Sequence, residues 1–393
     1  MTKKGRLDLW PWIVIGGQLL AGWRAEQNYQ GLPNVAPLRD RSRDETLPGI
    51  SVIVPARNEE ANLARLLASL VMQDYPCYEI IVVDDASSDG TADVARQYAG
   101  QGVRLLSSAG PPAGWTGKNA ACWLGANASH YPWLLFVDAD VELEALALRS
   151  SLTFALEQDV HALSLFARQR CESFWERLLL PFAYQQFFVG VDARLIHQTR
   201  GRALANGQYF LLERNVYQRV GGHAANAGSV IDDVALATTL KEHGIVPLAC
   251  RGEQLVTVRM YSNLHEISEG FGKNSYLFLR KAPLTGVQTA ICTWLAASVG
   301  VLFIRAAWKR SRLLPFLALV AYVLQVCGIQ PWLRRAGVRP AYAFLTPLAA
   351  LMFLKIALTS MLRVLTGRPL AWKGRSYRGE QKSQPRVTVE MVR

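Results

Sequence analysis

The sequence predicts an α/β fold with an open, mostly parallel sheet, followed by helices that lie in or on a membrane. Three observations support this prediction. Apolar, strand-like runs alternate with amphipathic, helix-like runs between residues 48 and 285, a pattern typical of parallel sheets that are covered on both faces. Two of the strand-like runs end in neighbouring carboxylates. Beyond residue 285, long apolar runs with few charges take over.

The alternation begins with a predicted strand at 49–56. A helix follows at 58–73, because four leucines recur there at helical spacing: Leu63, Leu66, Leu67 and Leu70. The later predicted strands are 78–85, 102–108 and 132–140, and the later predicted helices are 89–100, closed by Gly100, and 118–129. Strands joined by helices of this length pair in parallel, so their carboxyl ends share the edge at which open sheets bind ligands.

Composition divides the chain into four predicted regions. Residues 10–23 form a short apolar stretch, predicted to be an uncleaved anchor that lies in the interface or spans the membrane. Residues 24–48 are polar and contain three prolines, which is typical of a linker. The predicted domains are 1–47 (anchor and linker), 48–285 (α/β domain), 286–370 (transmembrane or interfacial helices) and 371–393 (basic tail).

The C-terminal region contains three long apolar runs. Runs 287–304 and 313–333 are each long enough, at about 18–20 residues, to span a bilayer. The third, 341–365, carries Lys355 near its middle, so it is predicted to lie in the interface or to pack against partners. The net charge of +12 is concentrated beside the apolar segments, which indicates an anionic membrane surface and no nucleic acid. Six well-separated cysteines without a CxxC pair indicate reduced, buried thiols.

The acidic strand ends are the first candidate site. Asp138 and Asp140 follow the fourth predicted strand and are expected on one side of an extended segment. Carboxylates in such a pair hold Mg²⁺ or Mn²⁺ and leave positions for water and phosphate oxygens. A helix cap or a solvated turn explains one DxD equally well, but a second acidic strand end, Asp84-Asp85, favours a ligand that both share.

Two further segments suit a phosphorylated ligand. In "GWTGKNAAC", Gly114 and Gly117 allow a tight turn and Lys118 begins a helix. A lysine at the electropositive start of a helix is favoured when it faces an anion such as a diphosphate, and otherwise is a surface lysine in a loop. Asp232 and Asp233 begin a later amphipathic helix, where they serve as caps or where one acts as a general base toward an acceptor hydroxyl.

Read in order, the motifs resemble those of family 2 glycosyltransferases with a GT-A fold, over roughly residues 48–280. The segments are "SVIVPARNEE", "VVDDASSDGT", "GWTGKNAAC", "FVDAD", "ANGQYFLLERNVYQRVGGH" and "IDDVALATTL". "GWTGKNAAC", "VRMYSNLHEISEGFGKN" and the apolar C-terminal region look most like bacterial carotenoid glycosyltransferases of the diaponeurosporenoate, chlorobactene or carotenoid 2′-hydroxyl type. Hopanoid-associated glycosyltransferases look similar and are close rivals.

The resemblance implies a donor site that binds a nucleotide-diphosphate sugar, a UDP- or GDP-sugar. The residues that it places around the nucleotide are Pro55, Arg57, Glu59, Asp84, Asp85, Lys118 and Asp138. Within this set, Asp85 would contact the base, with Asp84 behind it, and Lys118 would lie near the diphosphate. Asp138 and Asp140 match the DxD motif, whose second Asp usually meets the metal, Mg²⁺ or Mn²⁺.

The resemblance also implies the catalytic group. Asp233 aligns with the general base, and Asp232 stands where the family usually has Glu. Gly207 and Arg259 would support the site or lie on the acceptor side. The QxxRW signature of processive polysaccharide synthases is absent, and Arg259-Met260-Tyr261 occupies its region, which favours a single transfer over polymer synthesis.

These inferences predict an inverting glycosyltransferase at the bacterial cytoplasmic membrane, with its α/β domain facing the cytosol. Its acceptor would be a hydroxyl or carboxylate of a lipophilic isoprenoid, a carotenoid or in the rival interpretation a hopanoid. Segment 173–191 would form either a lid beside the membrane or a core helix. Two other classes share some features: a non-catalytic membrane scaffold of the same fold, and a nucleotidyltransferase.

Overall fold

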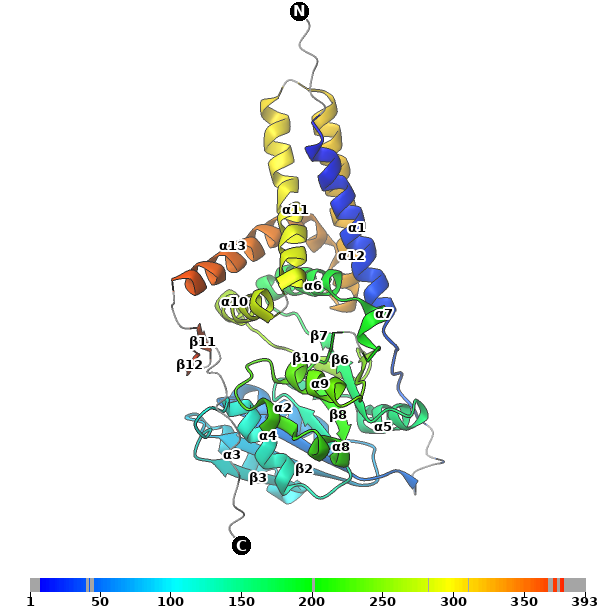
Figure 1. Cartoon of the computed structure of the whole chain (residues 1–393), viewed down its shortest axis with the longest axis vertical. Coiled ribbons are helices and arrows are strands. Elements are labelled where there is room, and N and C mark those ends of the chain that lie inside the picture. The colour runs from blue at the N-terminus through cyan, green and yellow to red at the C-terminus, as the bar shows by residue number, and fades with distance from the viewer. Residues whose placement is uncertain are drawn as a thin grey trace, which may run out of the picture. The chain divides into compact units, whose positions relative to one another are not determined.

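The computed structural model describes residues 8–39, 42, 46–199, 202–281, 283–309, 311–366, 370–372 and 375–377 (Figure 1). The backbone groups into two compact units, each assembled from distant segments of the chain. The helical unit comprises Met1–Ala36, Phe166–Arg202 and Ala249–Trp372, and the sheet unit comprises Pro37–Leu165, Ala203–Leu248 and Lys373–Arg393. The predicted boundaries at residues 48 and 285 follow composition along the chain and stay a prediction.

The sheet unit is built on the alternating strands and helices that the sequence predicts. Its strands are β1 (Ile50–Ala56), β2 (Tyr78–Asp85), β3 (Val103–Ser108), β4 (Trp133–Val137), β5 (Val141–Leu143), β6 (Ala162–Phe166) and β8 (Tyr209–Glu213). The main sheet has the order β3-β2-β1-β4-β8-β6-β9, and β9 spans Leu248–Arg251. β1 pairs in parallel with β2 and β4, and β2 with β3, whereas β8 runs antiparallel to β4 and β6. The prediction of a mostly parallel sheet is confirmed.

Helices pack this sheet through small and apolar side chains. The helices of the unit are α2 (Glu60–Val71), α3 (Thr91–Gln97), α4 (Gly117–Ala128), α5 (Ala147–Glu157), α8 (Arg214–Arg219) and α9 (Asp232–Glu242), with a 3₁₀ turn η3 (Gly222–Asn226). The four leucines that predicted α2 are all fully buried. In α4, Gly125 lies so close to the sheet that a Cβ atom there would be 2.5 Å from Ile53 Cγ2 and 3.1 Å from Val83 Cγ2.

Two predicted elements of the sheet unit end earlier than expected. The helix predicted at 89–100 ends at Gln97, and a 3₁₀ turn η2 (Ala99–Gln101) follows it. The residue in the left-handed conformation is Gly102, with φ 85°, so Gly102 and not Gly100 closes this segment. The strand predicted at 132–140 ends at Val137, and Asp138-Ala139-Asp140 forms a turn before β5. The expected extended conformation of the DxD segment was therefore wrong.

The helical unit begins with α1 (Trp10–Gln30), which is longer than the predicted apolar stretch. The prediction of a linker from residue 24 was wrong for 24–30, because these residues contain no glycine or proline and the helix continues to Gln30. Buried side chains continue along one face as far as Ala25 and Tyr29. The other elements of this unit are α6 (Phe174–Gly190), α7 (Ala193–Ile196), α10 (Leu264–Lys281), α11 (Pro283–Trp308), α12 (Leu313–Arg335), η4 (Pro340–Leu345), α13 (Thr346–Leu365), β7 (Arg168–Gln169), β10 (Val256–Val258) and β11 (Leu370–Trp372).

Three helical segments of the described chain are long and apolar enough to cross a membrane: Val287–Trp308, Leu313–Arg335 and Pro340–Arg363. They contain the three predicted apolar runs. By length and composition the third segment matches the other two although it includes Lys355, and its interfacial placement stays a prediction. Of the predicted basic tail 371–393, the structure describes Ala371, Trp372 and a short strand β12 (Arg375–Tyr377).

Of the two alternatives for segment 173–191, burial favours the core helix. Most of α6 is buried, and it packs against α1, α11, α12 and α13. Its first turn is closed by a capping box, in which Ser173 Oγ accepts from the Glu176 N–H and the Glu176 carboxylate accepts from the Ser173 N–H. Arg259 Nε donates to the same carboxylate at 3.0 Å.

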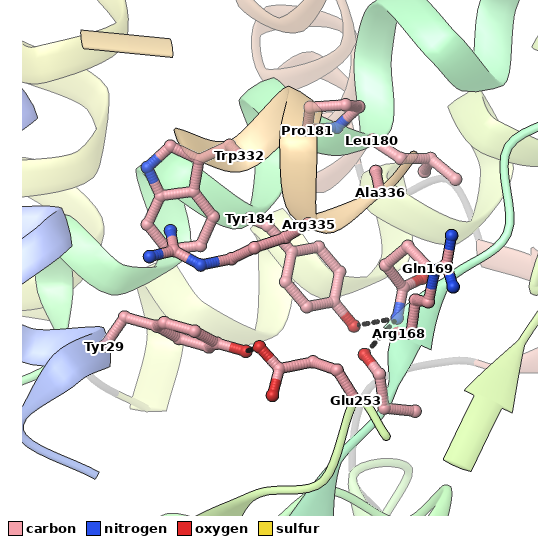
Figure 2. Close-up of a pocket in the computed structure, with 11 residues that line it drawn as sticks. Tyr29, Arg168, Gln169, Leu180, Pro181, Tyr184, Glu253, Trp332, Arg335 and Ala336 are labelled. Carbon is pink, nitrogen blue, oxygen red and sulfur yellow. Dashed lines mark hydrogen bonds between the residues drawn. The ribbon is translucent and has the colours of Figure 1, made fainter. Parts of the chain in front are cut away.

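A charged layer joins α1 to the end of α12. Figure 2 shows the Arg335 guanidinium between the rings of Tyr29 and Trp332, at 4.4 Å and 4.8 Å from their centroids. Arg335 also forms a bidentate pair with Glu26, and Tyr29 donates its hydroxyl proton to Glu253. The pocket beside this stack is small, with a cavity volume of about 20 Å³. Its charged side chains are largely matched within the helical unit.

The close approach of α4 to the sheet yields a stability test. Gly125→Ala should lower the thermal unfolding midpoint of the full chain in detergent, because the added methyl group overlaps Ile53 and overpacking costs about 1–3 kcal/mol. Gly100→Ala is the matched control, since no atom lies within 4 Å of its added Cβ. An unchanged midpoint for Gly125→Ala would show that α4 lies farther from β1 than described.

Candidate active site

The first group of predicted residues surrounds the carboxyl ends of β1 and β2. Pro55 lies within β1, Arg57 and Glu59 follow that strand, and Asp84-Asp85 end β2. In the register, Ala56 pairs with Asp84, and Ile53 pairs with Phe136 of β4. The carboxyl ends of β2, β1 and β4 therefore lie at the same edge of the sheet, although β4 ends at Val137, opposite Val54, and so stops short of its neighbours. With strands spaced about 4.8 Å apart, β2 and β4 are separated sideways by roughly 10 Å across β1.

Strained backbone marks this edge. Asn58 and Ala86, which follow β1 and β2, have φ values of 52° and 51°, a left-handed conformation that is uncommon for residues with a side chain. Arg57 Nη1 donates to the carbonyl oxygen of Asp85 at 2.8 Å and so ties the two strand ends together. Asp84 Oδ1 accepts from the Ser87 N–H at 3.2 Å. These contacts fix the loops in the conformation that surrounds Asp85.

The second group meets around one lysine. Lys118 is the second residue of α4, whose N-cap Thr116 accepts from the Asn119 N–H. Its Nζ lies 2.7 Å from Asp138 Oδ1 and 3.2 Å from Asp232 Oδ2. Lys118 begins a helix, as predicted, and the anions that it faces in this structure are carboxylates of the chain itself. That Lys118 faces a diphosphate stays a prediction. Asp140 lies in the same turn as Asp138.

Asp233 adjoins this lysine through Gly207. The Gly207 N–H donates to Asp233 Oδ2 at 2.7 Å, and the Val234 N–H donates to Asp233 Oδ1 at 2.8 Å. A Cβ atom on Gly207 would lie 3.1 Å from Lys118 Nζ and 3.3 Å from Asp233 Cβ. The absence of a side chain at Gly207 therefore lets the lysine and the aspartate approach. Lys118, Asp138, Asp232, Asp233 and Gly207 together are called the Lys118 cluster below.

The pKa values of the two neighbouring aspartates of the cluster are shifted in opposite directions. Burial and the negative charge of Asp232 raise the pKa of Asp233 to about 6, although Lys118 opposes the shift. Burial also acts to raise the pKa of Asp232, but the charge of Lys118 and the hydrogen bonds that the carboxylate accepts together outweigh burial, and the pKa of Asp232 is lowered. One carboxylate is thus kept ionised beside the lysine while its neighbour binds a proton near neutral pH. Two acidic groups whose pKa values are driven apart are typical of acid–base catalysis.

The structure adds a contact that sequence patterns did not indicate. Asn119 is fully buried, and its Nδ2 donates to the carbonyl oxygens of Asn226, Ala227 and Ser229 at 2.8 Å, 2.9 Å and 3.0 Å. The Thr116 N–H also donates to the Ala227 carbonyl oxygen at 2.8 Å. The start of α4 is thereby fastened to the loop that leads to Asp232 and Asp233. Segments about 110 positions apart in sequence make this contact, so no local pattern could reveal it.

Two more unpredicted side chains form the inner wall of the Lys118 cluster. Burial lowers the pKa of His223 to about 4, so it is neutral at physiological pH, and its Nδ1 lies 2.9 Å from the Tyr217 hydroxyl. Burial raises the pKa of Cys122 well above its usual value. All six cysteines are free, but only Cys122 and Cys250 are buried and Cys327 is exposed, so the expectation of buried thiols was wrong for Cys327. The wall therefore carries no charge of its own and leaves the cluster's charges to Lys118 and the carboxylates.

Arg259 lies in the helical unit, whereas the other predicted site residues lie in the sheet unit. Its guanidinium contacts Glu172 at 2.6 Å and Glu176 at 3.0 Å. The hydrogen bond with Glu176 raises the pKa of Arg259, and this effect is larger than the lowering caused by burial. The contacts of Arg259 are those of a residue that fixes the start of α6.

The donor set for a metal ion is small. Across the described residues, no three His, Cys, Asp or Glu side chains gather into a metal-binding group. Asp138 and Asp140 instead supply two carboxylates from one turn. Mg²⁺ and similar ions are often bound through one or two carboxylates, with water and substrate phosphates completing the shell. The residues present therefore fit an ion that arrives with a diphosphate, and do not form a closed protein cage.

Comparison with known proteins identifies the family of one segment of the chain. The model of glycosyl transferase family 2 matches residues 51–221. This segment is a family 2 glycosyltransferase domain. It contains the strand ends of β1, β2 and β4, Lys118, Asp138 and Gly207, and the resemblance predicted from the motifs is confirmed. Asp232 and Asp233 lie just beyond the matched segment.

Curated relatives of the glycosyltransferase domain extend the comparison. A 4,4′-diaponeurosporenoate glycosyltransferase of Staphylococcus haemolyticus is 31% identical over 239 residues, which are 60% of this chain and 63% of that protein. Its counterpart in Staphylococcus aureus strain USA300 is 27% identical over 334 residues, 84% of this chain and 88% of that protein. The chain thus spans less than two thirds of the first relative and most of the second.

A solved structure supports the fold. A mannosyltransferase from Pyrobaculum calidifontis, in complex with GDP-Man and Mn²⁺, superposes with a TM-score of 0.53, covering 86% of this chain and 96% of that one at 19% identity. With the family match, this likeness shows an α/β, GT-A-like fold.

The opposite pKa shifts of Asp232 and Asp233 predict how the turnover rate depends on pH. If Asp233 acts as a base, the turnover rate should fall about tenfold per pH unit as the pH drops below about 6, because the protonated carboxyl cannot accept a proton. Asp232→Asn removes a negative charge that raises this pKa, so the acid limb should move to lower pH. Asp93→Asn, at an exposed position of α3, is the control and should leave the profile in place. If the acid limb stays at the same pH in Asp232→Asn, protonation of Asp233 is excluded as its origin.

Proposed function

We propose that this protein is a membrane-bound, inverting glycosyltransferase that transfers a single sugar from a nucleotide-diphosphate sugar to a carotenoid-type isoprenoid acceptor. The observation that carries the proposal is the Lys118 cluster. It combines a fixed positive charge, a carboxylate in the DxD turn and a carboxylate whose pKa is about 6 within one family 2 domain. The names of the curated relatives support the acceptor class.

The donor would bind along the edge formed by the ends of β1, β2 and β4. Asp85 and Asp84 would recognise the base, while Pro55, Arg57 and Glu59 border the nucleotide. The left-handed residues Asn58 and Ala86 hold these loops open without a bulky side chain in the turn. Whether UDP- or GDP-sugars bind is decided by contacts to the base at Asp85.

The diphosphate would lie beside Lys118, with a divalent ion held by Asp138 and Asp140. Mg²⁺ or Mn²⁺ bound there supplies positive charge that stabilises the departing nucleotide diphosphate. Lys118 contributes a second positive charge at the electropositive start of α4.

Asp233 would remove the proton from the acceptor hydroxyl as its oxygen attacks the anomeric carbon. Attack opposite the leaving diphosphate inverts that carbon. The Gly207 and Val234 N–H groups orient the carboxylate, and a pKa of about 6 leaves it mostly deprotonated at neutral pH yet basic enough to accept a proton. A carboxylate acceptor would already be deprotonated and would need little help from Asp233.

The membrane would bring the acceptor to the enzyme. An apolar isoprenoid stays in the bilayer, and the three apolar helical segments are long enough to hold the chain there as well. The sheet unit would face the cytosol of the bacterial cytoplasmic membrane, where nucleotide sugars are made. A hopanoid or another lipid is the alternative acceptor. A non-catalytic scaffold or a nucleotidyltransferase is disfavoured by the family match and by the raised pKa of Asp233.

The proposed roles of Asp233 and Asp85 predict that substitutions at these positions affect sugar transfer and nucleotide binding differently. Asp233→Asn should lower transfer from labelled nucleotide sugars to the lipid acceptor by about 10²–10⁴-fold, because the base is lost, while nucleotide binding measured by calorimetry persists. Asp85→Asn should weaken nucleotide binding and leave the acid limb of the pH profile in place. Mass spectrometry of pigment extracts from cells with and without the protein would identify the glycosylated lipid. Loss of nucleotide binding with retained turnover in Asp233→Asn would overturn the assignment.

The two-carboxylate metal site predicts chelator sensitivity. EDTA should abolish transfer, and added Mn²⁺ or Mg²⁺ should restore it. Asp140→Asn should raise the metal concentration needed for half-maximal activity about tenfold or more, since one of two protein ligands is lost. Glu142→Gln, at an exposed position two residues further along, is the control. Full activity in EDTA would exclude this role for the DxD turn.

A further inference from the structure

The outward side of α1 carries a stripe of large apolar side chains, which recur every three or four residues. The members of this outward stripe are between 51% and 62% exposed: Leu9 just before the helix, and Trp12, Ile13, Leu19, Leu20 and Trp23 within it. The next exposed positions are Gln27 and Gln30, so the apolar surface ends after Trp23. A contiguous apolar surface on a helix is typical of a site that contacts a protein or a membrane.

The opposite side of α1 packs along α11 and α12, whose apolar segments are long enough to cross a membrane (Figure 1). One apolar cluster lies among the three helices and includes Val14 of α1, Val299 of α11 and Ala321 of α12, all fully buried. A Cβ atom on Gly22 would be only 3.4 Å from Gly328 Cα of α12. Close approach through small residues is typical of helices that pack inside membranes. The three helices thus form one bundle.

Ion pairs lie at both ends of this bundle. At one end, Asp8 contacts Arg305 at 2.6 Å and Lys309 at 3.4 Å. At the other end, Arg335 Nη1 donates to Glu26 at 2.9 Å. From residue 8 to residue 26 a helix rises about 27 Å, at about 1.5 Å per residue. This length is close to the hydrocarbon core of a bilayer, which is about 30 Å thick.

Tryptophans lie just inside both ion-pair layers. Trp12 is near Asp8 in sequence and Trp23 is near Glu26, and both belong to the outward stripe. Trp308, next to Lys309 at the end of α11, is 88% exposed. Tryptophan is enriched at the two membrane–water interfaces, where its ring contacts both lipid and water. The spacing of these rings therefore agrees with the spacing of the ion pairs.

A helix that lies flat on a membrane keeps a polar face toward water. Residues 9–23 of this chain have no such face, because they include no charged residue and their single amide, Gln18, is 9% exposed. α1 is absent from the three segments with span-like hydropathy because its last turns, from Arg24 onward, are polar. These turns lie at the Glu26 layer, where long basic side chains such as Arg24 reach the interface.

We propose that α1 crosses the bilayer as a third helix beside α11 and α12, with its outward stripe against lipid acyl chains. Leu9 and Ser311 then lie on one side of the membrane, and Gln27 lies on the other.

The connection to the sheet unit assigns that unit to the Gln27 side. α1 ends at Gln30 and the sheet unit begins at Pro37. The linker 31–36 reaches at most about 21 Å, at about 3.5 Å per residue, which is too short to recross a hydrocarbon core. Basic residues flank both ends of the bundle, so counting them does not assign the sides. That the Gln27 side is the cytosol rests on the proposed function.

Cysteine labelling tests the crossing without sugar or metal. Cysteines would be introduced singly at Leu9, Leu20 and Gln27, which follow one line along α1, and at Ser311. A membrane-impermeant maleimide would be added to intact bacterial spheroplasts, to lysed spheroplasts and to protein in detergent. Peptide mass spectrometry would then report the labelling of each cysteine separately.

Leu9→Cys and Ser311→Cys should be labelled in intact spheroplasts, Gln27→Cys only after lysis and Leu20→Cys only in detergent. The native Cys327 is the internal control for the bundle. It is exposed on α12 between the two ion-pair layers, so it too should react only in detergent.

Labelling of Leu9→Cys and Gln27→Cys from the same side, or of Leu20→Cys before detergent is added, would overturn the proposal. An oxidative cross-link between two copies of Leu20→Cys would overturn it as well, because a second chain would then cover the outward stripe. Leu19→Cys takes the place of Leu20→Cys if that variant does not fold. Labelling with the sides exchanged would confirm the crossing and contradict only the cytosolic placement of the sheet unit.

Discussion

The site depends on the contacts between one lysine and carboxylates from two other segments. Lys118 comes from the start of α4, Asp138 from the turn after β4 and Asp232 from the start of α9. With Asp233 next to Asp232, three negative charges would otherwise crowd this edge of the sheet and repel one another. One central cation makes their proximity favourable. The lysine also shifts the pKa values of Asp232 and Asp233 to different extents, because Asp232 contacts the ammonium group directly whereas Asp233 is held by backbone N–H groups.

Local patterns predicted much of the sheet unit. Leucine spacing placed α2, apolar runs placed β1 to β4, and the acidic strand ends placed the ligand edge, since each of these depends on residues that are neighbours in sequence. The errors arose where a boundary had no distinctive residue. Nothing in residues 24–30 stops a helix, so α1 continues through them. Two glycines near residue 100 were equal candidates for the closing position, and only the backbone conformation distinguishes Gly102.

The arrangement around Lys118 was predictable in part. The sequence named Lys118, Asp138, Asp232 and Asp233, but not that the lysine would pair with the carboxylates. The contact of Asn119 with the loop at 226–229 could not be foreseen, because an asparagine one residue after a lysine has no special pattern.

The order of segments along the chain has a consequence for biosynthesis. The sheet unit is interrupted by Phe166–Arg202, which belongs to the helical unit, and it resumes at Ala203. Strand β8 lies between β4 and β6, so the ribosome must synthesise α6 before the sheet can close. Asp232 and Asp233 emerge later still. The ribosome therefore completes α1 and α6 before it makes Asp232 and Asp233, so the Lys118 cluster cannot assemble until both helices have been synthesised.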